Sequence, residues 1–597
     1  MFMKFKDFFT PKKISVLLLL IILAVTVITY SHSLLAELVD WDDQFQVSNN
    51  LDIQSLSLFS VQKIFSNFYA GMYQPLATLS FALENKIWHS FPLFLHLDNL
   101  LLHLLNIILV YLLTKKLFKK NYLTLLSSAL FALHPLQVET VAWISARSNL
   151  LYTAFFLLAL ITYITYSEKT KLRYYFITLG CFILALLSKA PAVILPFILL
   201  LLDYYHQRQI NKHLFLEKIP FFILSLGFGW LTIKGRGLDD LIPPIIYSWL
   251  DKLTFLAYSP LSYLQKILFP YNLSTFYALP KLTNGHLPII FYLSVPIFLG
   301  LIFLMTKYRQ KRTLLLGVAW WLLLILPSIQ IKTFSTTLTA DRYTYLANLG
   351  IFWLIALAII STWKYFKNLQ FILGLAIIIS FGLLAIQTSN QTWVWQNSTT
   401  LWTDVIKHNP TSASAYTNLG NAKSKNNDIV GAMEAYNQAL ELNPQDPFIY
   451  NNIGTLLVEK TSRWQESLNY YNQAINLNPR EALFYYNRGC ALLKLNQKSE
   501  ALKDYQIAVN LRSGEKFYNY TYLNSLANLE YRLEHWSQAD KFYTQIIQTE
   551  PQLAEPYYFR GLSRIKLGNK TTGCQDLAQA DKLEYEEATS NYNKLCK

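Results

Sequence analysis

Long apolar segments recur through the first two thirds of the chain, and they constrain its fold more than any other feature. Eleven runs are of spanning length or slightly shorter: roughly 14–30, 97–114, 122–134, 149–166, 173–188, 192–204, 218–234, 288–305, 313–329, 346–362 and 369–387. About 20 apolar residues in a helix are needed to cross the hydrocarbon core of a bilayer. We therefore expect residues 1–390 to form a polytopic membrane domain with about eleven transmembrane helices.

The charges between these runs predict the orientation of the domain. Residues 391–597 carry 21 Lys+Arg and 21 Asp+Glu, so the whole net charge of +15 belongs to residues 1–390. Five loops are rich in basic residues: 115–120, 169–173, 208–212, 307–312 and 364–367. Because cytoplasmic loops carry an excess of Lys and Arg, these loops and the N-terminus should face the cytoplasm. The basic excess is thus a topology signal, and we exclude nucleic acid as a partner.

The segment 251–268 is interpreted as an interfacial or re-entrant helix, with a twelfth span as the alternative. It carries charged residues near both ends, among them Asp251 and Lys266, between apolar residues. This amphipathic pattern is typical of helices that lie in the membrane interface. With eleven spans and an internal N-terminus, the C-terminal part should lie on the non-cytoplasmic side. We favour a bacterial inner membrane over an endoplasmic reticulum membrane, although the sequence does not decide between them.

Under this topology one external face collects most of the distinctive polar residues of the membrane domain. Asp42 and Asp43 lie just beyond the first apolar run. Five further residues are predicted to reach the same face: His134, Glu139, Arg147, Lys189 and Arg342. Ionisable groups at membrane depth are mostly functional. Carboxylates and cations gathered there suit a site for an anionic lipid head group.

A different pattern begins after about Trp393, where the hydropathy falls and a repeat appears. Pro410, Pro444 and Pro479 are separated by 34 and 35 residues. In the first unit, small, apolar and aromatic residues occupy tetratricopeptide positions: Tyr416, Leu419, Gly420, Ala432, Tyr436 and Ala439. The spacing predicts about five repeats over 413–597, the last one degenerate, after a linker and lead-in helix at 391–412.

The repeats should stack into an α-solenoid with a concave surface, because each repeat buries its apolar face against the next. Four asparagines on the first helices of the repeats are candidates to line this groove: Asn418, Asn421, Asn452 and Asn487. They would bind an extended peptide backbone, with simple solvation as the alternative. The whole chain is thus predicted to be all-α, a transmembrane helix bundle followed by a tetratricopeptide solenoid.

The four cysteines do not indicate a zinc site. Cys181, Cys490, Cys574 and Cys596 show no C-x-x-C spacing, which zinc sites commonly use. A Cys574–Cys596 disulfide is one pairing that the sequence leaves open, since sequence alone does not determine connectivity. The sequence identifies no cofactor with certainty, and it leaves open whether a divalent metal is needed.

Several motifs resemble those of the transmembrane and tetratricopeptide repeat-containing protein family. They are Phe131-Ala-Leu-His-Pro-Leu-Gln-Val-Glu-Thr-Val-Ala-Trp143-Ile-Ser-Ala-Arg147, Tyr73-Gln-Pro75-Leu-Ala-Thr, His96-Leu-Asp-Asn99-Leu-Leu-Leu-His103 and Ala340-Asp-Arg342-Tyr. With the repeats, the resemblance covers nearly the full chain. That family is of the polytopic GT-C type and is similar to protein O-mannosyltransferases. This chain departs from the family at Gln137, where a second histidine is common, and at Ala190, where an acid is common.

The resemblance implies a membrane glycosyltransferase that moves a mannose-like hexose from a polyprenyl-phosphate carrier to Ser or Thr of polypeptides. Asp42 or Asp43 would be the catalytic base for the attacking hydroxyl. The carrier phosphate would be held by basic residues at the same face: Arg342, Arg147 and Lys189. His134 and Glu139 would have supporting roles, and the repeats would recruit the polypeptide or a partner protein.

Two other functions remain open at this point. One is a non-catalytic membrane scaffold whose repeats recruit envelope proteins, and the other is a GT-C transferase that acts on a lipid or glycan. A scaffold does not need a base and anion-binding groups on one face, which favours an enzyme. The structural alternatives are a solvated loop for the acids, an interfacial anchor for Arg147, and a local ion pair between Asp341 and Arg342.

Overall fold

In a computed structural model the chain is built almost entirely of helices, in two units, Met1–His408 and Asn409–Lys597. The structure describes residues 11–69, 71–89, 91–209, 211–236, 247–280, 282–308, 311–329, 337–511 and 516–597. Two short strands, β1 (Tyr277–Ala278) and β2 (Thr337–Thr339), form an antiparallel pair in the first unit. The predicted all-α class, a helix bundle followed by a repeat solenoid, is confirmed.

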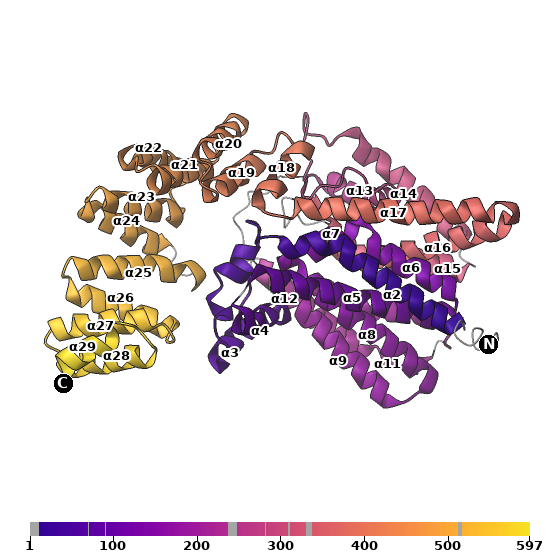
Figure 1. Cartoon of the computed structure of the whole chain (residues 1–597), viewed down its shortest axis with the longest axis horizontal. Coiled ribbons are helices and arrows are strands. Elements are labelled where there is room, and N and C mark those ends of the chain that lie inside the picture. The colour runs from indigo at the N-terminus through magenta and orange to yellow at the C-terminus, as the bar shows by residue number, and fades with distance from the viewer. Residues whose placement is uncertain are drawn as a thin grey trace, which may run out of the picture. The chain divides into compact units, whose positions relative to one another are not determined.

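Each of the eleven predicted apolar runs coincides with a helix of the first unit (Figure 1). In chain order these are α2 (Pro11–Tyr30), α5 (Pro92–Phe118), α6 (Asn121–Leu133), α8 (Arg147–Lys169), α9 (Leu172–Ser188), α10 (Leu195–Tyr205), α12 (Ile219–Arg236), α14 (Ile289–Lys307), α15 (Arg312–Ile325), α16 (Asn348–Tyr365) and α17 (Gln370–Val394). Among the described residues, seven meet the length and hydropathy of a membrane-spanning helix, and four are shorter apolar helices. The chain is therefore a multi-pass membrane protein, while the count of eleven spans stays a prediction.

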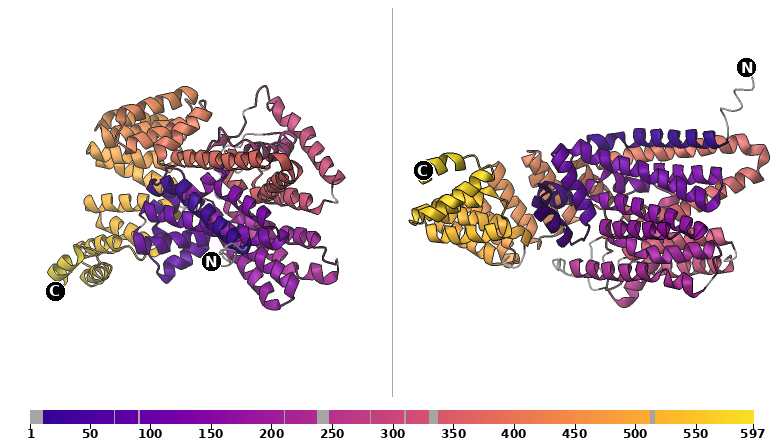
Figure 2. Two further views of the ribbon diagram at one scale, coloured as in Figure 1. Left: turned by 45° about the vertical axis from the view of Figure 1, so that its right-hand side comes forward. Right: turned by 90° about the horizontal axis from the view of Figure 1, so that it is seen from below.

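The long helices of the first unit run side by side in a bundle (Figures 1 and 2). Helix α5 packs against α6 and α8, α6 packs against α2 and α16, and α8 packs against α9. Several polar side chains of α5 are buried, among them His103 and Asn106. His103 Nδ1 lies 2.7 Å from the hydroxyl of Tyr345, and Asn106 donates a hydrogen bond of 3.0 Å to the carbonyl of Leu150. These bonds tie α5 to α8 and to the segment before α16.

Shorter helices connect the long ones. They are α3 (Leu58–Ser66), α4 (Pro75–Trp88), α7 (Val138–Ala142), α11 (Lys212–Leu216), α13 (Trp249–Leu268) and α18 (Ser398–His408), with the turns η5 (Ile144–Ala146), η6 (Ala190–Ile194) and η8 (Asp341–Thr344). Helix α13 is the segment predicted to lie at the membrane surface. It does not meet the combined length and hydropathy of a membrane-spanning helix, which seven of the long helices meet. Its N-terminus is closed by a capping box, in which Ser248 and Asp251 each accept a hydrogen bond from the other's backbone N–H. The interfacial position of α13 stays a prediction.

The second unit is an array of paired helices. The pairs are α19 (Ala413–Lys425) with α20 (Ile429–Leu442), α21 (Pro447–Lys460) with α22 (Trp464–Leu477), α23 (Ala482–Lys494) with α24 (Lys498–Leu511), α25 (Lys516–Arg532) with α26 (Trp536–Thr549), and α27 (Ala554–Lys566) with α28 (Lys570–Lys582). A Cβ atom at Gly420 would lie 2.4 Å from the ring of Tyr436, and one at Gly489 would lie 2.7 Å from that of Tyr505. The small and aromatic positions thus meet within these two pairs, as the repeat pattern predicted.

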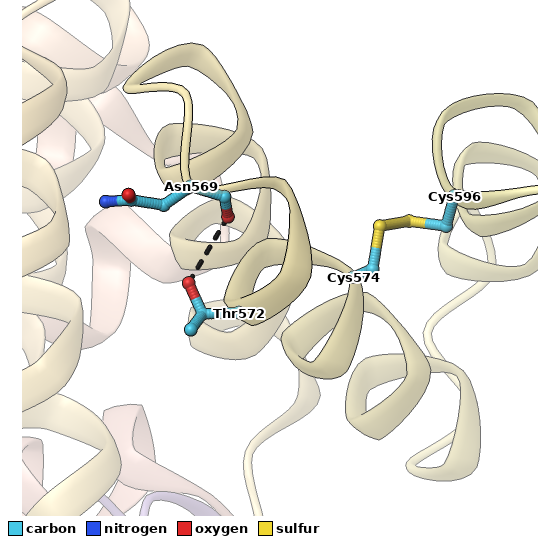
Figure 3. Close-up of a disulfide and its surroundings, with 4 residues drawn as sticks. All are labelled: Asn569, Thr572, Cys574 and Cys596. Carbon is cyan, nitrogen blue, oxygen red and sulfur yellow. Dashed lines mark hydrogen bonds between the residues drawn. A yellow bond between two sulfur atoms is a disulfide. The ribbon is translucent and has the colours of Figure 1, made fainter.

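A disulfide closes the C-terminal end of the array (Figure 3). Cys574 of α28 is bonded to Cys596 of the last helix, α29 (Ala588–Cys596), with Cα atoms 5.6 Å apart. The structure therefore contains the pairing that the sequence left open. Cys181 and Cys490 are free thiols.

Candidate active site

Asp43 anchors the acidic loop that follows α2. One carboxylate oxygen accepts a hydrogen bond of 3.0 Å from the backbone N–H of Val39. The other oxygen accepts one of 3.0 Å from the backbone N–H of Ser145 and a second from the hydroxyl of Ser145. Burial raises the pKa of Asp43 to about 6, and these donors oppose that rise. Because both oxygens are occupied, Asp43 suits a structural role that fastens the loop to η5.

Asp42 is in a different environment, although it is the adjacent residue. Its side chain is half-buried, and among the described residues no hydrogen-bond donor meets its carboxylate. Arg342 and Lys189 are close enough to act on it electrostatically. Burial raises the pKa of Asp42, and these two positive charges oppose the rise. Asp42 is therefore a carboxylate that can meet a ligand beside two cations.

Arg342 is fixed by Glu139 of α7. One oxygen of Glu139 accepts a hydrogen bond of 2.8 Å from the backbone N–H of Arg342, and the other forms an ion pair with Nη1. The guanidinium lies 5.2 Å from the ring centroid of Trp143 and 4.9 Å from that of Tyr343. Within the described part of the chain, Nε and Nη2 of Arg342 have no hydrogen-bond partner. The side chain is thus oriented and retains donors for an anion.

Asp341 pairs with Lys266 of α13 and not with Arg342, so the predicted alternative of a local Asp341–Arg342 pair is wrong. Lys266 Nζ lies 3.2 Å from Asp341 and 3.1 Å from the ring centroid of Tyr277. The hydroxyl of Tyr277 also donates a hydrogen bond of 3.3 Å to Asp341. These contacts connect α13 and β1 to η8, the turn that carries Arg342.

Arg147 is almost completely enclosed, with a side chain that is 1% exposed. Its Nε donates a hydrogen bond of 2.8 Å to Asn99, and Nη2 donates one of 2.7 Å to the carbonyl of Leu95. Its Nη1 forms an ion pair with Glu84. The guanidinium also lies 4.4 Å from the ring centroid of Phe81. These partners occupy the donors, so we assign Arg147 to stabilising the fold rather than to the phosphate contact or the interfacial anchor.

His134 connects the end of α6 to α13. Its Nδ1 accepts a hydrogen bond of 3.2 Å from the N–H of Leu136, and its Nε2 lies 3.0 Å from the carbonyl of Ile267. The proton of the neutral ring therefore belongs on Nε2, and both nitrogens are used by the backbone. Among the described residues, no group of three or more His, Cys, Asp or Glu is arranged to hold a metal ion.

The candidate groove asparagines form links between neighbouring repeats. Asn452 donates a hydrogen bond of 3.0 Å to the side chain of Asn421, and Asn487 donates one of 2.9 Å to that of Asn451. Asn418 is half-buried on the same helix as Asn421. Asn451 in turn donates a hydrogen bond of 3.2 Å to Asn452, so three of the four predicted residues belong to one ladder of hydrogen bonds.

Sequence reasoning missed three residues of this region. Ser145 orients Asp43, while Lys266 and Tyr277 hold Asp341. Lys266 was interpreted only as one charge of an amphipathic helix, because nothing in the local pattern shows which loop its ammonium reaches. Ser145 lies inside the motif block between Phe131 and Arg147, so its position in that block could have marked it as a site residue.

Comparisons with known proteins match both units. Residues 74–230 match the family described as dolichyl-phosphate-mannose-protein mannosyltransferase. Residues 413–446 and 470–503 match tetratricopeptide repeat families. The first match includes Glu139 and Lys189 but not Asp42 or Arg342.

Two relatives are similar over most of this chain. The human protein O-mannosyl-transferase TMTC3 is 24% identical over 96% of this chain and 65% of its own length. The protein O-mannosyl-transferase F38B6.6 of Caenorhabditis elegans is 25% identical over 71% of this chain and 63% of its own length. The chain thus spans less than two thirds of these relatives. The solved tetratricopeptide protein YrrB, described as having an unusual peptide-binding site, is 22% identical over 32% of this chain and 98% of its own, with a TM-score of 0.28.

Fold and site together define a multi-pass membrane protein with an acid-and-cation site in its helix bundle, followed in the sequence by a tetratricopeptide array. The resemblance to the transmembrane and tetratricopeptide repeat-containing family, expected from the motifs, is confirmed by the matched regions and by these relatives.

Proposed function

We propose that this protein is a membrane glycosyltransferase that moves a mannose-like hexose from a polyprenyl-phosphate carrier to Ser or Thr of polypeptides. The observation that carries the proposal is the placement of Asp42 beside Arg342 and Lys189. A half-buried carboxylate that has no hydrogen-bond donor among the described residues, next to two cations, fits proton transfer coupled to the departure of a phosphate. The matched mannosyltransferase region and the names of the relatives support the same reaction.

The reaction requires few groups. The acceptor hydroxyl oxygen attacks the anomeric carbon, its proton passes to the carboxylate of Asp42, and the bond between the anomeric carbon and the phosphate oxygen breaks. The lipid phosphate leaves with the electron pair. Arg342 and Lys189 stabilise its growing negative charge, Arg342 through the donors that Glu139 leaves unused. We assign Asp42 as the base and Asp43 as the anchor of the same loop.

We further propose that the reaction and the repeats are on the non-cytoplasmic side of the membrane. The basic loops between the apolar helices support this orientation. The Cys574–Cys596 disulfide also supports it, because disulfides persist in oxidising compartments and are rare in the cytosol. A bacterial inner membrane with periplasmic repeats is the favoured location.

The repeats are proposed to recruit the acceptor polypeptide or a partner protein. Stacked repeats of this kind offer an extended concave surface. Asn418 and the ladder formed by Asn421, Asn452 and Asn487 would supply hydrogen bonds to an extended peptide backbone there.

The test is transfer of radiolabelled sugar from a polyprenyl-phosphate donor to a Ser/Thr peptide by the purified full chain. Asp42→Asn serves as the control with a strongly reduced rate. If the sugar is transferred to a lipid or glycan and not to the peptide, the proposed polypeptide acceptor is wrong. If folded wild-type protein transfers sugar to no acceptor, the proposed enzymatic function is wrong and a scaffold function is favoured.

A further inference from the structure

The segment after α17 folds back onto the acidic loop, although it was expected to act as a linker to the repeats. Within the unit Met1–His408, the backbone N–H of Glu37 donates a hydrogen bond of 2.9 Å to the carbonyl of Gln396. The side chain of Gln396 donates one of 2.7 Å to the carbonyl of Leu35. The backbone N–H of Asp40 donates one of 2.7 Å to the hydroxyl of Ser398, the first residue of α18. Three hydrogen bonds thus join residues 35–40 to residues 396–398.

An aromatic stack extends this contact to the residue next to Asp42. Trp402 of α18 is buried, and its ring is stacked on that of Trp41 with centroids 5.1 Å apart and an interplanar angle of 26°. Trp41 also contacts Trp143, at 5.7 Å between centroids. The guanidinium of Arg342 lies 5.2 Å from the ring centroid of Trp143, whose ring is also stacked on that of Trp395. A continuous row of side chains therefore connects α18 to Arg342, the residue proposed to bind the carrier phosphate.

Asp42 lies between two sets of anchors. On its C-terminal side, Asp43 is bonded to Ser145 of the bundle. On its N-terminal side, Asp40 and Trp41 are held by Ser398 and Trp402. Asp42 itself has no protein hydrogen bond to its carboxylate in the described part of the chain, so its direction depends on both neighbours. The bundle supplies one set of anchors and α18 supplies the other.

We propose that α18 is a positioning element of the active site, and that Ser398 and Trp402 orient the carboxylate of Asp42. This inference rests on the proposed function, in which Asp42 is the base. A base must be held close to its productive geometry, and a displacement of about 1 Å can cost about 10²-fold in rate. Helix α19 begins five residues after α18 ends, so the helix that orients the base is also the one from which the repeats continue.

The test compares four variants of the full chain in the sugar-transfer assay. Ser398→Ala removes one hydrogen bond and should lower kcat about threefold to tenfold. Trp402→Ala should lower kcat at least about tenfold with little change in the KM for the donor. Trp402→Phe keeps an aromatic face and should recover most of the loss. Thr403→Ala changes an exposed side chain of the same helix and should behave as wild type.

Two further measurements separate positioning from general destabilisation. If Trp402 acts through Asp42, adding Trp402→Ala to Asp42→Asn should cause no further loss, whereas a purely structural role would add one. Hydrogen exchange of the peptide covering residues 35–44 should quicken in Ser398→Ala and Trp402→Ala but not in Thr403→Ala.

Wild-type kcat in both Ser398→Ala and Trp402→Ala would overturn the inference. If wild-type protein transfers no sugar, the proposed function fails instead, and the exchange measurement still decides whether α18 holds the loop. Unchanged exchange in both variants would overturn the anchoring as well.

Discussion

The carboxylate of Asp43 accepts hydrogen bonds from both the backbone N–H and the hydroxyl of Ser145, a residue 102 positions away. This contact divides the roles within a pair of adjacent acids. The carboxylate oxygens of Asp43 are hydrogen-bonded within the fold, whereas Asp42 lies within electrostatic range of Arg342 and Lys189. Charge alone does not distinguish the two residues, but their partners do.

The two acids should therefore respond differently to the same substitution. Asp42→Asn should reduce the transfer rate by about 10²–10⁴-fold with normal folding, because a general base contributes that much. Asp43→Asn replaces one accepting oxygen by an NH₂ group, which would then face a backbone N–H donor. This variant should cost about 1–3 kcal/mol of stability. The transfer assay and thermal unfolding of the purified chain measure the two effects. Wild-type transfer by folded Asp42→Asn would refute the assignment of the base.

The rate should also depend on pH through Asp42. A base acts only when ionised, so transfer should fall as the pH drops through the pKa of Asp42, which burial raises above its usual value of 3.8. Lys189 opposes that rise, so Lys189→Met should move the acidic limb of the rate profile to higher pH. Lys86→Met, at an exposed residue of α4, is the matched control. An unshifted limb in Lys189→Met would mean that Lys189 does not act on the base.

Most of the helices could be predicted because their signals are local. An apolar run or a recurring pair of small and aromatic residues depends only on neighbours in the sequence, and both matched helices of the structure. The side of the membrane on which the polar residues lie stays a prediction from the loop charges. Segment 391–412 was harder, because its contacts with the acidic loop join residues more than 350 positions apart.

The individual roles at the site could not be predicted for the same reason. Arg147 was a candidate for the phosphate by type and side, but its neighbours Glu84 and Asn99 come from α4 and α5. A charged residue has the same sequence signature whether its partner is a ligand or another side chain. The distinction depends on distant partners, which a single sequence does not display.

The disulfide should stabilise the C-terminal end of the repeats. Cys574 and Cys596 are 22 residues apart, and closing a loop of that size contributes about 3 kcal/mol. Replacing both by Ser should therefore loosen α29, which limited proteolysis of the full chain would detect as early loss of the C-terminal helix. Cys490→Ser removes a free thiol and should not change the pattern. Equal protease resistance of both variants would show that the bond adds no local stability.

The repeats should be accessible from outside the cytoplasmic membrane. In intact spheroplasts, added protease should remove residues 400–597 while the bundle helices remain protected. Protection of the repeats that ends only when the membrane is permeabilised would contradict both the eleven-span topology and the proposed side of the reaction.

The last prediction concerns Arg342 and its partner. Arg342→Lys keeps the charge but loses the planar fork, so it should raise the KM for the donor and lower kcat/KM about tenfold or more if the phosphate is bound by two donors. Glu139→Gln keeps the size of the side chain but removes the charge that fixes Arg342, whose side chain is 14% exposed. Because breaking a buried pair leaves an uncompensated charge, this variant should lose stability as well as activity.

The matched control is Arg463→Lys. Arg463 pairs with Glu466 on α22 in the same chain, but these side chains are 55% and 39% exposed. Exposed pairs contribute about 0–1 kcal/mol, so Arg463→Lys should leave transfer and stability unchanged. If Arg342→Lys transfers sugar with the wild-type KM and kcat, a single positive charge at this position is sufficient, and the two-donor contact with the phosphate is not needed. Lys189 then becomes the stronger candidate for the phosphate contact, since it already acts on Asp42 as a point charge.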